Sequence, residues 1–311
     1  MALSEVAYLS LLQNGGLLDR VKKAYTHLSK CDICPLSCSA DRLHGKTGTC
    51  KTGKFARISS FGAHYGEEDP ISGFRGSGTI FFSCCNLHCQ YCQNFEISQF
   101  HSGKEVLPED LATIMLELQS SGCHNINLVS PTHVIPQILE SVYIAAQKGL
   151  SLPLVYNSGG YDRVEILRLL DGVIDIYMPD MKYADARNGL KYSKIPDYPA
   201  INQLAVKEMY NQVGDLITDE NGIASRGLLI RHLILPNNIA GTDLIVKFIT
   251  NQISKNSYLN LMDQYRPTYN AYKFSEINRS ITKEEYTNAL QLARTAGLNI
   301  LDQKKSLYRW L

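Results

Sequence analysis

The sequence predicts an α/β fold, a partial (β/α)6 barrel of the TIM type that follows a small cysteine-rich module. From about residue 82 onward, short apolar runs alternate with longer segments of helical pattern, which is typical of parallel strands joined by crossover helices. Eight of the nine cysteines fall into two tight groups within the first 92 residues, which indicates metal ligation there. We therefore expect an N-terminal helix and four-cysteine metal-binding module over residues 1–65 and a core over residues 66–311.

Six apolar runs have the length and composition of buried strands. They cover residues 79–83, 125–130, 152–157, 173–178, 228–235 and 259–263. A complete barrel of this type has eight strands, so six predict an open barrel. In such barrels the chemistry gathers at the carboxyl ends of the strands, where the following loops begin.

The segments between the strands carry recognisable boundary signals. A helix is expected after Pro108, with Gly122 at its C-terminal cap. Thr282 and Glu285 form a capping box before a helix that is expected to run to about residue 298. The polar, turn-rich segment 214–227 predicts an inserted hairpin before the fifth strand, and a plain loop is the alternative.

The composition limits the classes of function. The chain has 311 residues, of which 44% are hydrophobic and 20% charged, and its 31 Lys and Arg nearly balance its 30 Asp and Glu. Without a basic field or a long apolar run, we expect neither a nucleic-acid partner nor a membrane partner. The apolar patch at residues 6–12 lacks the flanks of a signal peptide and predicts a first helix. Clustered cysteines as metal ligands fit a reducing compartment, so we expect a cytoplasmic protein.

Cys85, Cys89 and Cys92 form a C-x3-C-x2-C motif directly after the first predicted strand. Three thiolates can hold three irons of a four-iron cluster and leave the fourth iron open, whereas an electron-carrying cluster is normally closed by four cysteines. The alternative is a structural zinc knuckle, although zinc usually takes paired C-x2-C hooks. Cys84 is the other possible first ligand, but it gives the poorer spacing and is expected to pack under the loop.

Polar residues lie at the carboxyl ends of the predicted strands, which would meet at one edge of the sheet. The candidates are Ser130, Thr132, Asn157, Ser158, Asp180, Lys182, Arg231, His232 and Gln264. Singly, the hydroxyl residues could be ordinary helix caps and the nearby glycines ordinary turns. Five polar strand ends above one cysteine loop instead predict a binding site for a cofactor with mixed polar groups.

A second cysteine group lies in the N-terminal module. Cys31, Cys34, Cys38 and Cys50 supply four thiolates within twenty residues. Four soft ligands close a tetrahedral site, for zinc or for an auxiliary four-iron cluster. Either metal centre would be structural or electron-carrying.

The segments FFSCCNLHCQYCQNFEIS, LVYNSGGYD, YMPDMKY, RHLILP and MDQYRP together resemble the radical S-adenosylmethionine (SAM) enzymes, in the subgroup labelled pyruvate formate-lyase activating enzyme-like. The resemblance implies a 4Fe-4S cluster on Cys85, Cys89 and Cys92, which reduces SAM and cleaves it to methionine and a 5'-deoxyadenosyl radical that takes a substrate hydrogen. It also implies an electron donor of the flavodoxin or ferredoxin type.

The resemblance further assigns individual contacts. Asp180 and Lys182 match the Asp-x-Lys that contacts SAM, and Tyr91 would pack against the cluster and adenine. Arg231 and His232 would hold the methionine carboxylate or the substrate. The chain departs from the family at the Gly-Gly-Glu segment, where Ser130 and Thr132 stand, and before the first cluster cysteine, where Cys84 replaces the usual glycine.

Three hypotheses for the substrate step follow. By resemblance, the enzyme would be an activase that generates a glycyl radical on a partner protein. Radical modification of a small molecule or peptide is the second hypothesis. A non-catalytic iron-sulfur or zinc protein is the third, and it would be supported by a fourth cysteine closing the triplet, which the sequence does not offer.

Overall fold

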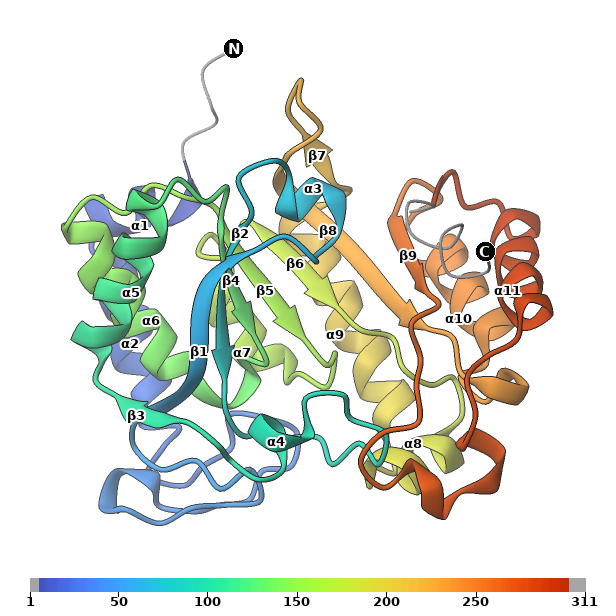
Figure 1. Cartoon of the computed structure of the whole chain (residues 1–311). Helices are drawn as coiled ribbons and strands as arrows, with labels where there is room; N and C mark the ends of the chain where they lie inside the picture. Colours follow the sequence, from blue (N-terminus) through green and yellow to red (C-terminus); the bar gives the residue numbers. More distant parts are fainter. Residues whose placement is uncertain (1–5, 302–311) are drawn as a thin grey trace.

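The computed structural model describes residues 6–301, and these form one ten-stranded sheet with its longer helices on one face (Figure 1). The strand order is β10-β9-β8-β6-β5-β4-β2-β1-β3, and β7 pairs with β8 off this path. The strands are β1 (Ala56–His64), β2 (Ser77–Phe82), β3 (Lys104–Val106), β4 (Ile126–Val129), β5 (Leu154–Ser158), β6 (Ile176–Pro179), β7 (Ile217–Thr218), β8 (Ala224–Leu233), β9 (Tyr258–Met262) and β10 (Ile300–Leu301).

The six predicted strands correspond to β2, β4, β5, β6, β8 and β9, and the structure confirms that they are parallel neighbours in this order. The strands β4, β5 and β6 are buried along their whole length, which explains why they read as apolar runs without alternation. The result is an open sheet that curves as a partial barrel.

The helices connect the strands and cover the outer face of the sheet. They are α1 (Ala7–Gln13), α2 (Gly16–Thr26), α3 (Asp69–Ser72), α4 (Phe95–Ser98), α5 (Pro108–Ser120), α6 (Ile135–Gln147), α7 (Val164–Leu167), α8 (Ala186–Ser193), α9 (Tyr198–Val213), α10 (Thr242–Phe248) and α11 (Lys283–Thr295). The predicted first helix corresponds to α1, and the predicted capping box opens α11, where Thr282 and Glu285 bond reciprocally. The helix after Pro108 is α5, and Gly122 follows it with a positive φ of 83°.

Three strands were not predicted, and these are β1, β3 and β10. The longest, β1, pairs antiparallel with β2, and β3 pairs with β1, so the sheet includes residues 56–64, which the sequence assigned to the N-terminal module. The short β7 pairs antiparallel with β8 and confirms the hairpin over residues 214–227. The predicted core extends to residue 311, and residues 302–311 lie outside the described part of the chain.

Candidate active site

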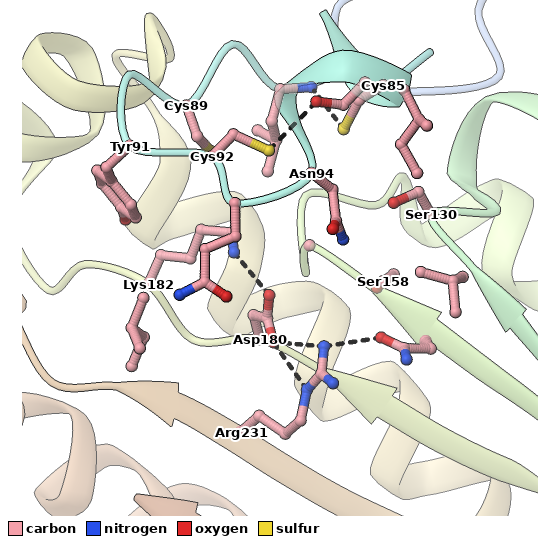
Figure 2. Close-up of a pocket in the computed structure, with 18 of the residues that line it drawn as sticks. Cys85, Cys89, Tyr91, Cys92, Asn94, Ser130, Ser158, Asp180, Lys182 and Arg231 are labelled. Atoms are coloured by element: carbon pink, nitrogen blue, oxygen red, sulfur yellow. Dashed lines mark hydrogen bonds and ion pairs between the residues drawn. The ribbon is translucent and has the colours of Figure 1, made fainter. Parts of the chain in front are cut away.

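A cavity of about 250 Å³ opens at the carboxyl ends of the parallel strands, where the loop after β2 meets the ends of β4, β5, β6, β8 and β9 (Figure 2). Parallel pairing brings these ends to one edge of the sheet. The predicted residues that line the cavity are Cys85, Cys89, Tyr91, Cys92, Ser130, Asn157, Ser158, Asp180, Lys182, Arg231 and Gln264. Most of the polar strand ends therefore converge as the sequence predicted.

The three cysteines of the loop after β2 all line this cavity. Each sulfur has a polar neighbour: the Leu87 N–H for Cys85 at 3.4 Å, the Ser193 hydroxyl for Cys89 at 3.0 Å, and the Ser98 hydroxyl for Cys92 at 3.2 Å. Hydrogen bonds of this kind tune cluster-bound thiolates, so the loop fits a 4Fe-4S cluster. Burial raises the pKa of the Cys85 and Cys89 thiols, and a bound metal would displace their protons.

Cys84 does not line the cavity. Its side chain is buried, its N–H donates to the Ile97 carbonyl, and its thiol lies against Thr52 in the N-terminal module. Its φ of 72° is in the left-handed region that favours glycine, which matches the glycine usual at this place in the enzymes it resembles. The cavity therefore receives three cysteines and not four.

The number of cysteines bears on the zinc alternative. A structural zinc is normally closed by four protein ligands. Three cysteines line the cavity, and Cys84 lies outside it. Three thiolates fit a four-iron cluster with one open iron better than they fit a closed zinc knuckle.

Asp180, at the end of β6, is the centre of a buried charge network. One carboxylate oxygen accepts a hydrogen bond from Lys182 Nζ at 2.6 Å and the other accepts one from Arg231 Nε at 3.0 Å (Figure 2). Arg231 also donates to the Asn157 side chain at 2.7 Å. Burial opposes ionisation of Asp180, but the charges of Arg231 and Lys182 outweigh it and hold the pKa of the carboxyl below its usual value.

Thr132 is the first correction to the predicted site. Its hydroxyl donates to buried Asp162 at 2.7 Å, and it does not line the cavity. Tyr156 and Ser158 donate to the same carboxylate at 2.8 and 2.7 Å. The Ser158 hydroxyl proton is therefore used in this hydrogen bond and is not free to donate to a ligand. The network joins the ends of β4 and β5, and its role is to fix their loops.

His232 is the second correction. It is fully buried on the face of β8 opposite Arg231, because successive residues of a strand point to opposite faces. Its Nδ1 lies 2.6 Å from the Met181 carbonyl and its Nε2 lies 2.9 Å from the Thr242 hydroxyl. A carbonyl only accepts, so Nδ1 carries the proton and Nε2 accepts from Thr242. Both nitrogens are therefore occupied, and His232 is not available to a ligand.

Asn94 is a cavity residue that the sequence reasoning missed. It lies between the cysteine loop and Ser130 in Figure 2 and precedes α4 without making a side-chain cap bond, which leaves its amide for the cavity. Its position two residues after Cys92 is the sequence feature that could have indicated a place in the cavity. Asn94, Gln93, Arg231, Met262 and Gln264 also line a second cavity of about 570 Å³, so the two spaces adjoin.

The second cavity is formed by the connection between β1 and β2, which the sequence did not predict to reach the site. Glu67 lies 3.6 Å from Arg231, and Glu68 accepts a hydrogen bond from Asn260 at 2.7 Å. Asp263 and Arg266 contribute further charges to the lining. This space is more polar than the first cavity and extends it toward β9.

The four N-terminal cysteines lie together, apart from this site. With Arg42 and His133 they line a small space of about 10 Å³. The sequence predicted that these four cysteines share one metal site. Within residues 6–301, no three of the thiols are close enough together to bind one metal ion.

The chain is similar to known proteins in sequence and in fold. Residues 72–179, which include the three loop cysteines, match the 4Fe-4S single cluster domain family. The uncharacterized protein MJ0674 of Methanocaldococcus jannaschii is 33% identical over 296 residues, covering 92% of this chain and 80% of that protein. The chain belongs to the MJ0674 family. A second protein of that organism, the uncharacterized protein MJ0808, is 22% identical over 260 residues, covering 77% of this chain and 71% of its own length.

The fold of this MJ0674-family chain is similar to that of a radical SAM methyltransferase from Sphaerobacter thermophilus, with a TM-score of 0.50, 12% identity, and coverage of 74% of this chain and 67% of that chain. At 12% identity this similarity concerns the fold of the chain. Among residues 6–301, no helix combines the length and apolar character that crossing a membrane requires.

The burial of His232 predicts acid-dependent loss of stability. Burial lowers the pKa of His232 to about 4, whereas an unfolded histidine titrates near about 6.5. As the pH falls below 6.5, His232 becomes protonated in the unfolded state but stays neutral in the folded state. The free energy of unfolding therefore decreases. The free energy of unfolding should be about 1.4 kcal/mol lower at pH 5.5 than at pH 7.5 from this group alone.

Urea unfolding at both pH values measures this effect. His232→Gln should lose that part of the pH dependence, and His44→Gln, at an exposed position, is the control that should keep it. Equal pH dependence in His232→Gln and the unaltered protein would contradict the assignment.

Proposed function

We propose that this protein is a radical SAM enzyme that cleaves S-adenosylmethionine reductively and abstracts a hydrogen atom from its substrate. One observation carries the proposal: three cysteines line the cavity at the mouth of the sheet, while the neighbouring Cys84 faces away. Among the described residues this leaves one iron of a bound 4Fe-4S cluster without a cysteine ligand. An open iron is what a cluster needs to bind a reacting molecule.

When bound, the cluster supplies the one-electron reduction that splits SAM into methionine and a 5'-deoxyadenosyl radical. The electron would come from a reductant of the flavodoxin or ferredoxin type. The chain contributes binding, orientation and exclusion of water, which a reactive radical requires. Tyr91 is buried and packs edge-on against Tyr265 with ring centroids 5.6 Å apart, so its ring supports a rigid, apolar wall beside the cysteines.

The charged network supports binding of a zwitterionic cofactor. Lys182 and Arg231 supply two cations, and Asp180 and Glu67 supply two carboxylates within ion-pair distance of them. The positive charge of Lys182 favours the thiolate forms of Cys85 and Cys89, which places this lysine beside the cysteine loop. We assign the methionine carboxylate of SAM to Lys182, and hydrogen bonds to its polar groups to Asn94 and Ser130.

The adjoining polar cavity supports a place for the substrate, because it opens from the cofactor cavity through Asn94 and Arg231. The finer proposal is an activase that generates a glycyl radical on a partner protein, and it rests on the sequence resemblance. Modification of a small molecule or peptide is the alternative, and the size of this cavity, about 570 Å³, is compatible with one.

Replacing all three loop cysteines with alanine should abolish reductive SAM cleavage, because the cluster loses its ligands. The protein is reconstituted anaerobically with iron and sulfide, reduced with dithionite, and assayed for 5'-deoxyadenosine and methionine. Cys123→Ala, which removes a buried cysteine outside the cavity, is the matched control and should leave cleavage unchanged. SAM cleavage that survives the triple replacement would rule out the proposed chemistry.

Lys182→Ala should weaken SAM binding by about 1.5 to 3 kcal/mol, the contribution of a charge-assisted hydrogen bond, which is roughly a 10- to 150-fold higher Kd. Equilibrium binding of SAM to the reconstituted, unreduced protein measures it. Lys191→Ala removes a surface lysine paired with Glu276 and serves as the control. An unchanged Kd for Lys182→Ala would remove Lys182 from the cofactor site.

The substrate class can be tested separately. If the enzyme is an activase, a partner captured anaerobically should show a carbon-centred radical by electron paramagnetic resonance after addition of SAM and reductant. The triple cysteine variant should give no such signal. Deuterium transfer into 5'-deoxyadenosine from a small molecule alone would exclude the activase proposal and leave the radical mechanism intact.

A further inference from the structure

Arg42 is a buried cation, and residues 6–301 give it no carboxylate partner. Its side chain is fully buried, and its polar contacts are the Gly53 carbonyl at 2.9 Å, the His133 carbonyl at 2.8 Å and the Cys31 sulfur at 3.7 Å. Its Nη2 has no hydrogen-bond partner in the described structure. A guanidinium taken out of water needs a compensating negative charge, because desolvation of an unpaired charge costs several kcal/mol.

Among the described residues, the acidic groups that line the small space beside Arg42 are four thiols. Cys31, Cys34, Cys38 and Cys50 lie there with Arg42, and none of them is in a disulfide. Four thiolates around a metal carry net negative charge, whether the metal is one zinc ion or a four-iron cluster. Such a centre would supply the counter-charge that Arg42 lacks.

Two further features fit a bound metal. A Cβ atom at Gly48 would lie 2.1 Å from the Cys38 sulfur, so only glycine leaves room for this thiol in its position. His133 lines the same space, is buried, and has an unpartnered Nδ1. Its Nε2 lies 3.0 Å from the Ser83 carbonyl and so carries the proton, which leaves a lone pair on Nδ1.

We propose that the four N-terminal cysteines bind a metal centre as thiolates, that Arg42 is its buried counter-ion, and that His133 links this centre to the loop carrying Cys85. The link is direct: Arg42 donates to the His133 carbonyl, and His133 donates to Ser83, two residues before Cys85. Cys84 reaches the module from the same loop, because its thiol lies against Thr52. The described thiols do not converge on one point, so metal binding draws them together.

The first test asks whether the module holds metal, in a protein that lacks the loop cysteines. The Cys85→Ala, Cys89→Ala, Cys92→Ala variant is prepared once with zinc and once by anaerobic reconstitution with iron and sulfide, and its metal is measured by mass spectrometry. About one zinc or about four irons per chain supports the proposal and identifies the centre. No metal above the level of the same variant carrying Cys34→Ser and Cys50→Ser would overturn it.

The second test addresses the counter-ion. Arg42→Met keeps an unbranched apolar stem and removes the charge, so transfer of the metal to a chelator should become 10-fold or more faster. Arg42→Lys keeps the charge and should recover part of the loss. The control is Arg187→Met, which removes an exposed arginine that pairs with Asp185. Metal transfer from Arg42→Met at the rate of the unaltered protein would exclude the counter-ion role.

The third test addresses the link, and this part rests on the proposed cluster at the loop. His133→Leu should lower the iron bound by the loop cysteines and alter the paramagnetic signal that responds to SAM, whereas His133→Gln, with an amide that can donate to Ser83, should preserve both. Unchanged iron and an unchanged signal in His133→Leu would exclude the link. If the loop holds no cluster at all, the proposed function fails, while the first two tests still decide the N-terminal centre.

Discussion

The buried carboxylate of Asp180 holds the cavity in shape. Beyond Lys182 and Arg231, its backbone carbonyl accepts hydrogen bonds from Tyr198 and Asn202, so this single residue ties β6, β8 and α9 together. Without the carboxylate, Lys182 would lose its ion-pair partner, and Arg231 would keep only the longer contact to Glu67 at 3.6 Å. Removing one partner of a buried ion pair typically costs about 3 to 5 kcal/mol, so the mouth of the sheet depends on this interaction.

A second buried acid, Asp162, has different neighbours from Asp180, and its pKa shifts in the opposite direction. It accepts hydrogen bonds from three hydroxyls and has no cation beside it, and burial raises the pKa of its carboxyl. Asp180 experiences the opposite balance because two cations face it. Asp162 therefore fixes two loops by hydrogen bonding, while Asp180 keeps its charge beside the two cations that line the cavity with it.

The two cysteine groups differ in access and in ligand number, and this difference decides what each can do. Three cysteines face a cavity of about 250 Å³ that continues into a larger polar space, so a bound cluster would retain an open position. Four cysteines line a space of about 10 Å³, where a metal would have all its ligands from the protein. Metal sites with an open position permit chemistry, whereas closed sites stabilise the fold. We therefore assign a reactive role to the three loop cysteines and a structural role to the four N-terminal cysteines.

The sequence by itself determined the six parallel strands, the capping box at Thr282 and the converging cysteine loop, because these depend on local patterns of apolar residues, caps and spacing. Only the tertiary structure decided which polar residues reach the cavity. Arg231 and His232 are adjacent, yet one faces the cavity and the other packs behind the strand, and the facing side is set by the neighbouring strands and helices. The contribution of Glu67, from the connection between β1 and β2, depends on a contact between residues far apart in sequence, and no local pattern encodes such a contact.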